Sequence, residues 1–309
     1  MILIADSGST KTAWAVIPSE ARLTLHAPRI APRAHTLSCS CGESLRVITT
    51  GGLNPYFLSS QEITQEISTR LLPRLPGEPI QAVYFYGAGV TPAKQEQMQG
   101  CLQEAFGGAQ TQVASDLLGS ARALFGREGS GIACILGTGS NSALYERGEL
   151  LQNIPALGFI LGDEGSGAVL GKLFLGSMFK GTLPPEVYEA FSARFGLSVS
   201  DVIERVYRSP LPNRFLASFA PFIRELTHEY PSVRELVEGA FTAFLTRNVL
   251  LYPAARTLPV GFVGSIAYHF ADELRAACRR AELRLPADSV VASPLGGLVR
   301  YHLQDEHAL

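Results

Sequence analysis

The sequence lacks long hydrophobic runs and has few charged residues. Charged residues make up 17% of the 309 residues, hydrophobic residues make up 46%, and the formal net charge is −2. Such a composition is typical of a chain that folds around real cores, and its overall charge gives no sign of nucleic-acid binding. No apolar run reaches the roughly 18 residues that a transmembrane helix needs. No basic segment precedes the apolar start Ile2–Ala5, which Asp6 interrupts, so we expect no signal peptide.

Cysteines are few and scattered. The five are Cys39, Cys41, Cys101, Cys134 and Cys278. An odd, dispersed set fits a reducing compartment better than a disulfide framework, so we expect a cytoplasmic protein. The first two form C-x-C, but no Cys/His cluster elsewhere would complete a zinc site. Two strand cysteines on one face are the better interpretation.

Acidic residues are absent from the stretch Ala21–Gly42, which carries arginines, histidines and two prolines. We interpret this stretch as a long solvated connection, and a partner-binding arm is the alternative. The connection leads to a predicted third strand near Leu45–Ile48.

A glycine-rich stretch, Asp6–Thr12, lies between two short apolar runs, Ile2–Ala5 and Ala13–Ile17. The runs predict buried strands, so the stretch between them predicts a hairpin turn. Small residues in such a turn leave backbone N–H groups bare for an anion, and Lys11 adds a charge suited to phosphate. Asp6, at the end of the first strand, could hold a hydrated Mg²⁺. The spacing is not that of a Walker P-loop, and an ordinary polar hairpin is the alternative.

The same design returns later in the chain. Ile132–Leu136 predicts another buried strand, which runs into Gly137–Ser142 before an apolar strand resumes. Ser7-Gly8-Ser9 of the first turn is echoed by Thr138-Gly139-Ser140 of the second. Two strand–loop–strand units of one design predict two related domains that grip phosphates between two hairpins.

Strands and helices alternate along the chain at lengths typical of α/β architecture. A short strand, Thr111–Ala114, delivers Asp116 at its C-terminal end, where open α/β sheets place ligands. A carboxylate there suits the base that phosphoryl transfer needs, and capping of the helix Leu117–Phe125 is the alternative. We predict an N-terminal domain of residues 1–115 plus 294–309, and a C-terminal domain of residues 116–293 with helical insertions.

Four motifs together carry a family resemblance. D-x-G-S-T-K-T stands at Asp6–Thr12, G-T-G-S-N at Gly137–Asn141, G-D-E-G-S at Gly162–Ser166, and an adenosine-type glycine motif at Gly261–Ser265. With these motifs in family order over nearly its whole length, the chain resembles the BadF/BadG/BcrA/BcrD-type ATPases. Within that group it is similar to the N-acetylglucosamine kinase-like members of the acetate and sugar kinase, Hsp70 and actin superfamily. The resemblance implies two RNase H-like (actin-like ATPase) domains, with ATP and Mg²⁺ in the cleft between them.

The resemblance also implies roles for individual residues. Asp116 matches the catalytic base toward the sugar hydroxyl, and Thr10 and Thr138 match threonines that contact the nucleotide phosphates. Asp6 is expected to hold Mg²⁺ through water. The residues expected to bind ATP or its phosphates are Ser7, Gly8, Ser9, Thr10, Lys11, Gly137, Thr138, Gly139, Ser140, Gly264 and Ser265. The residues expected to bind the sugar are Asn54, Asp116, Leu157, Gly158 and Asp163.

Two positions depart from the family pattern. In relatives of the mammalian kinase, one tryptophan stands two residues after the asparagine that matches Asn54. Another stands just before the glycine that matches Gly158. Here those positions hold Tyr56 and Leu157. We therefore expect the stacking and acetamide-facing parts of the sugar pocket to differ.

The sequence thus predicts an ATP- and Mg²⁺-dependent kinase that phosphorylates the 6-hydroxyl of an amino sugar. N-acetylglucosamine is the first choice, while glucosamine, N-acetylmuramic acid and muropeptide sugars stay open. We expect a small-molecule amino sugar as the partner, no nucleic acid and no membrane, and leave a homodimer open.

Two other functions are kept as alternatives. One is an ATPase activator of an iron–sulfur dehydratase or reductase, which needs thiolates beside the second phosphate loop. Cys134 is near that loop but lies in the predicted buried strand, without a suitably placed second cysteine. The other is a non-catalytic nucleotide-binding regulator, which should lack the base that Asp116 supplies.

Overall fold

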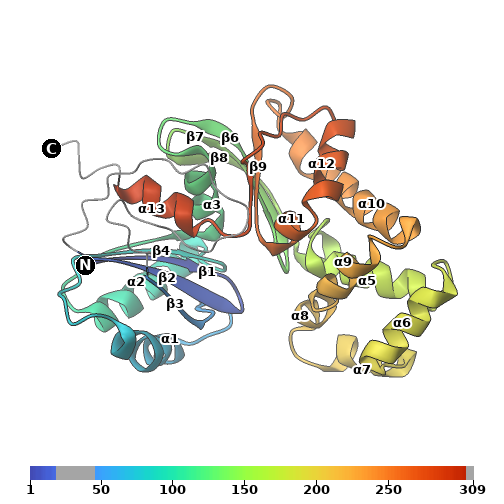
Figure 1. The fold of residues 1–309 in the computed structure, drawn as a ribbon. Helices are drawn as coiled ribbons and strands as arrows, with labels where there is room; N and C mark the ends of the chain where they lie inside the picture. The colour runs from blue at the N-terminus through green and yellow to red at the C-terminus, as the bar shows by residue number, and fades with distance from the viewer. Residues whose placement is uncertain (19–45, 304–309) are drawn as a thin grey trace. The chain divides into compact units, whose positions relative to one another are not determined.

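The computed structural model describes residues 1–18 and 46–303, which divide into two compact units (Figure 1). Unit 1 contains Met1–Gly129, the short segment Arg147–Glu149 and the chain from Ser293 onward. Unit 2 contains Ser130–Glu146 and Leu150–Ala292. Each unit has its own sheet and its own hydrophobic core.

Unit 1 is built on a five-stranded mixed sheet. Its strands are β1 (Ile2–Ser7), β2 (Lys11–Ile17), β3 (Arg46–Gly51), β4 (Ala82–Gly87) and β5 (Gln110–Ser115), in the order β3-β2-β1-β4-β5. The first three strands are antiparallel, whereas β4 and β5 run parallel to β1. In β1, Leu3 and Ala5 enter one core and Ile4 enters another. Because both faces of the sheet are covered, apolar residues follow one another along its central strands and do not alternate with polar ones.

Helices cover both faces of this sheet. The face that carries Trp14 and Phe85 packs against α1 (Ser60–Glu66) and α2 (Pro92–Phe106). The other face packs against α3 (Asp116–Phe125) and α13 (Leu295–Leu303). Helix α1 begins with a capping box between Ser59 and Glu62. It continues as a π-helical turn over Ile67–Leu71 and a 3₁₀ turn over Leu72–Arg74.

Unit 2 repeats the same sheet. Its strands are β6 (Ser130–Leu136), β7 (Ser140–Glu146), β8 (Glu149–Ile154), β9 (Val260–Val263) and β10 (Val290–Val291), in the order β10-β9-β6-β7-β8. Here too the first hairpin is antiparallel and the next two strands along the sheet run parallel to its first strand. The glycine-rich turns therefore occupy equivalent places in two sheets of one topology.

A large helical part accompanies the second sheet. It comprises α4 (Gly158–Leu161), α5 (Gly167–Phe179), α6 (Pro185–Phe195), α7 (Val199–Arg208), α8 (Pro212–Ala217), α9 (Ala220–Leu226), α10 (Pro231–Arg247), α11 (Ser265–His269) and α12 (Ala271–Arg280), with a 3₁₀ turn at Val249–Leu251. Phe191 of α6 contacts the rings of Phe174, Phe219 and Phe222, which joins the helices in one aromatic core.

The α/β class and the repeated sheet are as the sequence predicts, but the division of the chain differs. The sequence places the domain boundary after residue 115, whereas the segment up to Gly129 belongs to unit 1. The physical reason is packing, because α3 lies against α13, β1, β4 and β5 of the first sheet. Strand β8 had no clear signal in the sequence.

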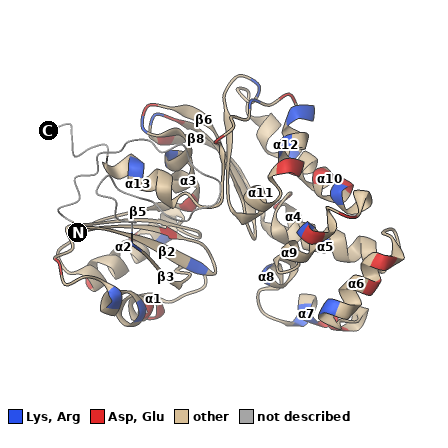
Figure 2. Ribbon diagram, in the orientation of Figure 1, with Lys and Arg blue, Asp and Glu red and all other residues tan. Residues whose placement is uncertain are grey.

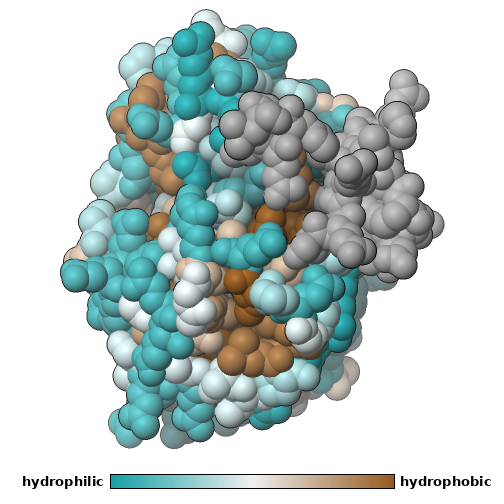
Figure 3. Space-filling model, turned by 90° about the vertical axis from the view of Figure 1, so that its left-hand side faces the viewer, coloured by the Kyte–Doolittle hydropathy of each residue, from teal (hydrophilic) through white to brown (hydrophobic). Residues whose placement is uncertain are grey.

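Other expectations concern the surface. The stretch Ala21–Gly42, with Cys39 and Cys41, lies outside the described residues. Among the helices of residues 1–18 and 46–303, none is long and apolar enough to cross a membrane. Acidic and basic residues are scattered over both units (Figure 2). On the face drawn in Figure 3, hydrophilic residues surround a smaller hydrophobic area.

Candidate functional site

The first glycine-rich turn joins β1 to β2 in unit 1. The N–H of Gly8 donates to the carbonyl of Lys11 at 2.9 Å, which closes a tight turn. Gly8, Thr10 and Lys11 are exposed, and Ser9 is half-buried. The turn therefore offers exposed backbone, a hydroxyl and an ammonium group. Together these groups suit an anion such as a phosphate.

Ser7 and Thr12 lie beneath this turn rather than on its surface. Both side chains are fully buried, and their hydroxyl oxygens are 2.8 Å apart. The Thr12 hydroxyl donates to the carbonyl of Gly51, and the N–H of Leu53 donates to Ser7 Oγ at 3.1 Å. The Ser7 hydroxyl therefore supports the turn from below, whereas the sequence placed Ser7 among the phosphate-binding residues.

The segment Gly52–Asn54 packs against the same turn. A Cβ added to Gly52 would lie 2.6 Å from the carbonyl oxygen of Gly8 and equally close to the backbone of Ser9. The side chain of Asn54 is buried, and its Nδ2 donates to Ser9 Oγ at 3.4 Å. The predicted sugar-contacting asparagine thus touches the predicted phosphate turn.

Gly89 leaves the room that the Asn54 amide occupies. A Cβ at this position would lie 2.1 Å from Asn54 Oδ1, and Gly89 has a φ of +77°, which glycine adopts readily. Asn54 Oδ1 also accepts the N–H of Tyr56 at 2.9 Å. The amide thus has a hydrogen-bond partner at each end, Ser9 at Nδ2 and Tyr56 at Oδ1.

Two carboxylates lie at the ends of parallel strands in unit 1. Asp6 is near the end of β1 and Asp116 follows β5, with β4 between them. Burial and the charge of Asp116 raise the pKa of Asp6 to about 7, whereas the Ser293 hydroxyl, which donates at 3.3 Å, and Lys11 lower it. Burial raises the pKa of Asp116 to about 6, although backbone N–H groups oppose the shift. The charge of Asp116 thus disfavours ionised Asp6, an arrangement that a bound cation would relieve. Carboxylate oxygens suit a Mg²⁺ ion that keeps several waters.

The helix that starts at Asp116 is capped by the preceding residue. Ser115 is the N-cap of α3, and its Oγ accepts the N–H of Leu118 at 3.2 Å. Asp116 is the first helical residue, and its Oδ1 accepts the N–H of Leu117 at 2.9 Å. Because a serine already serves as the cap, the capping alternative for Asp116 loses its main support.

Two glycines fix the position of Asp116 through close packing. A Cβ on Gly119 of α3 would lie 2.8 Å from the side chain of Tyr86 at the end of β4. A Cβ on Gly297 of α13 would lie 2.4 Å from the carbonyl oxygen of Ala123. The helix that carries Asp116 is therefore held tightly between the sheet and α13.

The raised pKa of Asp116 predicts a pH dependence. A carboxylate can accept a proton only when it is ionised, so activity is lost as pH falls below the folded-state pKa of about 6. With saturating Mg²⁺, we expect kcat/KM for the sugar to fall about tenfold per pH unit below that value and to level off above pH 7. A profile that stays flat down to pH 4.5 would show that ionised Asp116 is not required.

The second glycine-rich turn, Gly137–Gly139, joins β6 to β7 in unit 2. It is shorter than the sequence predicts, because β7 already begins at Ser140. The N–H of Gly137 donates to the carbonyl of Gly139 at 2.9 Å, and Thr138 is half-buried.

The predicted adenosine motif packs directly against this turn. A Cβ added to Gly264 would lie 2.2 Å from the last carbonyl oxygen of β6. Gly264 has a φ of +125°, and the next residue, Ser265, is exposed at the start of α11. The close approach and the backbone conformation both require glycine here.

The G-D-E-G-S motif also contacts the second turn. Asp163 Oδ1 accepts the N–H of Ser140 at 3.2 Å, and a Cβ on Gly139 would lie 3.0 Å from Asp163 Oδ2. Burial raises the pKa of Asp163, while the Ser140 N–H lowers it. The N–H of Gly167, which opens α5, donates to the carbonyl of Gly137 at 2.8 Å. The motif and the turn thus form one hydrogen-bonded structure.

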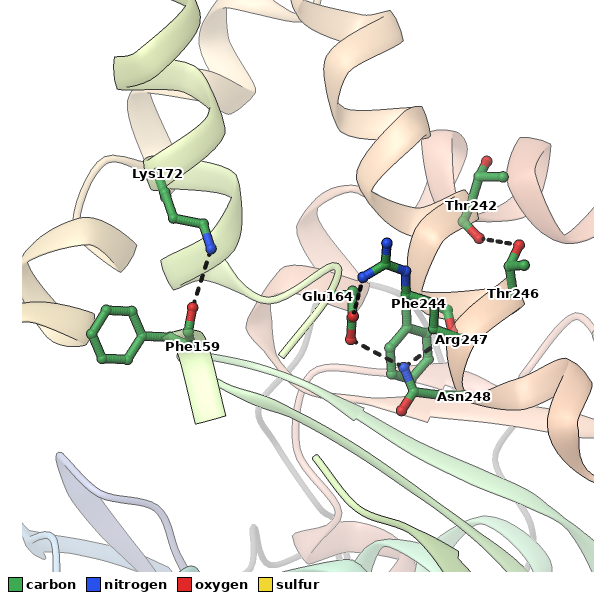
Figure 4. Close-up of polar contacts among 8 residues, drawn as sticks. All are labelled: Phe159, Glu164, Lys172, Thr242, Phe244, Thr246, Arg247 and Asn248. Carbon is green, nitrogen blue, oxygen red and sulfur yellow. Dashed lines mark hydrogen bonds and ion pairs between the residues drawn. The ribbon is translucent and has the colours of Figure 1, made fainter. Parts of the chain in front are cut away.

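Glu164 anchors the other side of this motif (Figure 4). Its carboxylate accepts from Arg247 Nη1 at 3.2 Å and from the buried Asn248 Nδ2 at 3.3 Å, at the end of α10. Lys172 of α5 donates to the carbonyl of Phe159 in α4 at 3.2 Å. Glu164 is therefore a structural partner of the loop rather than a second base.

The remaining predicted sugar residues, Leu157 and Gly158, lie at the start of α4. Leu157 is 64% exposed and has a left-handed backbone, and Gly158 follows it with a φ of +73°. Tyr56, the other departure from the family pattern, is 68% exposed in unit 1. Neither side chain is committed to a core, so both are available to a ligand.

Sequence reasoning missed four residues of these sites. Gly52 and Gly89 make room for site residues, but nothing in the local sequence distinguishes them from ordinary turn glycines. Gly119 carried no signal within its helix. Ser293 precedes a proline and a Gly-Gly pair, a helix-start pattern that hinted at its place but not at its hydrogen bond to Asp6.

No protein-family model matches the sequence, and no curated protein is a significant match. Among solved structures, a putative N-acetylglucosamine kinase from Porphyromonas gingivalis is 43% identical over 99% of this chain and 100% of that chain, with a TM-score of 0.86. A putative N-acetylglucosamine kinase from Chromobacterium violaceum is 21% identical over 96% and 97% of the two chains, with a TM-score of 0.65. A ROK family glucokinase from Streptomyces griseus, solved with glucose and AMPPNP, is 13% identical over 96% and 98%, with a TM-score of 0.52. The last two likenesses concern the fold alone.

Proposed function

Because the chain belongs to the N-acetylglucosamine kinase-like family of sugar kinases, we propose that it transfers the γ-phosphate of ATP to the 6-hydroxyl of N-acetylglucosamine. The observation that carries the proposal is 43% identity over nearly the full length of both chains. The half-buried carboxylates Asp6 and Asp116 and the two glycine-rich turns supply chemistry that suits it. The proposal also holds that the enzyme works in the cytoplasm and leaves a homodimer open.

Asp116 is the proposed base. Its pKa of about 6 leaves it mostly ionised at neutral pH, yet basic enough to take a proton. As the sugar O6 forms its bond to the γ-phosphorus, the bond from that phosphorus to the bridging oxygen of ADP breaks. The hydroxyl proton passes to the Asp116 carboxylate and from there to solvent.

The two turns are the proposed phosphate-binding elements. In unit 1, Thr10 offers a hydroxyl and Lys11 a positive charge on the turn that the Gly8 N–H closes, and Thr138 offers a hydroxyl from unit 2. Phosphoryl transfer depends mainly on positioning and charge neutralisation, so rigid turns of this kind supply most of what the protein must contribute.

Mg²⁺ is the proposed metal. Asp6 would hold it through water, with Asp116 nearby, and when bound the ion would neutralise charge on the phosphate oxygens. Asp6 is held by the Ser293 hydroxyl, which leaves the rest of the carboxylate for coordinated water.

The iron–sulfur activator is less well supported. Cys134 is fully buried in β6, and burial raises the pKa of its thiol well above the ordinary value. A buried thiol in a central strand is poorly placed to ligate a cluster at the surface, which favours the kinase over the activator.

The experiment is an ATP-to-ADP assay against a panel of sugars. We expect rapid turnover with N-acetylglucosamine or a close amino-sugar relative. Glucose should be at least about 10²-fold worse in kcat/KM, because it would leave buried polar groups unpaired. If no amino sugar raises ADP formation above the rate with ATP alone, the proposal is wrong.

A further inference from the structure

In both units, the predicted sugar-binding side chain contacts the predicted phosphate turn of its own unit. In unit 1, Asn54 donates to Ser9 Oγ at 3.4 Å. In unit 2, Asp163 accepts from the N–H of Ser140 at 3.2 Å. The two contacts occur at equivalent turns of two sheets with one topology.

The contacts are parts of broader packing rather than isolated hydrogen bonds. In unit 1, Gly52 approaches the backbone of Gly8 and Ser9 so closely that a Cβ would overlap it, and its N–H donates to the Thr10 carbonyl at 3.2 Å. The N–H of Leu53 reaches the buried Ser7 hydroxyl under the same turn. Any displacement of the segment around Asn54 is therefore transmitted to the turn.

Unit 2 has the corresponding arrangement. The N–H groups of Gly167 and Ala168 donate to the carbonyls of Gly137 and Thr138 at 2.8 and 3.1 Å. Asp163 lies within van der Waals reach of Gly139. The loop that carries Asp163 is therefore joined to the second turn by hydrogen bonds at three points.

We propose that these contacts couple sugar binding to nucleotide binding within each unit, and that Ser9 is a positioning residue that joins Asn54 to the first phosphate turn. A sugar that fixes the Asn54 amide also fixes the Ser9 hydroxyl and the turn around it. The nucleotide then binds a turn that is already ordered, so it loses less freedom on binding. This inference rests on the proposed function, because it takes the same sugar and nucleotide sites.

The test is isothermal titration of the full chain with Mg²⁺ and a non-hydrolysable ATP analogue, with and without saturating N-acetylglucosamine. The ratio of the two Kd values measures the coupling, and we expect at least about a fivefold ratio in the wild type. Ser9→Ala removes the acceptor for Asn54 and should bring that ratio toward 1, a decrease of about two- to fivefold, which lies within the effect of one hydrogen bond. The Kd for sugar alone should change much less than the ratio.

Two variants accompany this test. Ser9→Thr keeps the hydroxyl and should restore most of the coupling, which a merely structural defect would not allow. Ser68→Ala is the matched control, because the exposed Ser68 hydroxyl bonds only to the Gln65 carbonyl of its own helix among the described contacts. Thermal unfolding curves verify that all three variants are folded.

The outcomes separate the two ideas. If wild-type protein binds no amino sugar, the proposed function fails and the coupling fails with it. If wild type binds sugar but the ratio is below about twofold, the coupling alone is wrong. If the ratio is present in wild type and Ser9→Ala changes it by less than about twofold, the assignment of Ser9 is overturned while the kinase proposal stands.

Discussion

Replacing Asp116 with asparagine is expected to lower kcat by about 10²–10⁴-fold, while the Kd values for sugar and for Mg²⁺-nucleotide stay close to those of the wild type. The amide keeps the size of the side chain and can still accept the N–H of Leu117 at Oδ1, so α3 should form normally. It cannot accept the hydroxyl proton of the sugar. Steady-state kinetics combined with isothermal titration measure both quantities.

Asp201→Asn is the matched control for this prediction. Asp201 lies in the first turn of α7 and completes a capping box with the N-cap Ser198, so it is an aspartate whose described role is structural support of a helix start. We expect that variant to lower thermal stability modestly and to leave kcat unchanged. If Asp116→Asn behaved like Asp201→Asn, Asp116 would be a helix-terminal residue and not the base.

Replacing Asp6 with alanine is expected to lower kcat/KM for Mg²⁺-ATP by about 10- to 100-fold, the usual effect of losing a group that holds a metal through an outer contact. Binding of the sugar alone should change little, because the described hydrogen bonds of Asn54, the predicted sugar-binding residue of the same unit, go to Ser9 and Tyr56 and not to Asp6. Titration with sugar and, separately, with Mg²⁺-nucleotide distinguishes the two effects. Equal losses of both would mean that Asp6 is mainly structural.

The stability of the same variant provides a second readout. The folded-state pKa of Asp6, about 7, lies above its ordinary value of 3.8, so the folded state prefers the protonated form. Asp6 therefore lowers stability as pH rises from about 4 through 7, and its removal should not decrease the melting temperature at pH 8 without Mg²⁺. A large decrease would show that the carboxylate stabilises the fold.

Local signals in the sequence predict most of the fold. The apolar runs around Asp6–Thr12 and before Gly137 are bounded by glycine and polar residues, so strand, turn and strand are all marked within a short window. The capping box at Ser59 and Glu62 marks the start of α1 in the same way. Because these signals depend on neighbours in the chain, they can be read without the structure.

What the sequence could not predict depends on contacts between distant residues. Helix α3 belongs to unit 1 because Gly297 of α13 packs closely against Ala123 of α3. Ser7 and Thr10 flank the same turn, but Ser7 is buried and Thr10 is exposed. This difference depends on Leu53, which packs underneath and donates its N–H to the Ser7 hydroxyl. The link between Asn54 and Ser9 likewise requires β3 to lie beside β2. None of these has a local pattern.

The most direct test of the kinase assignment is the product balance of a single reaction with ATP, Mg²⁺ and N-acetylglucosamine. Mass spectrometry measures ADP and the phosphorylated sugar, and phosphorus NMR locates the phosphate. We expect equal amounts of ADP and a sugar 6-phosphate, with little ADP formed when the sugar is omitted, because water should be a poor acceptor in the absence of the sugar. Steady ADP formation without sugar, together with no phosphorylated amino sugar, would contradict the kinase assignment.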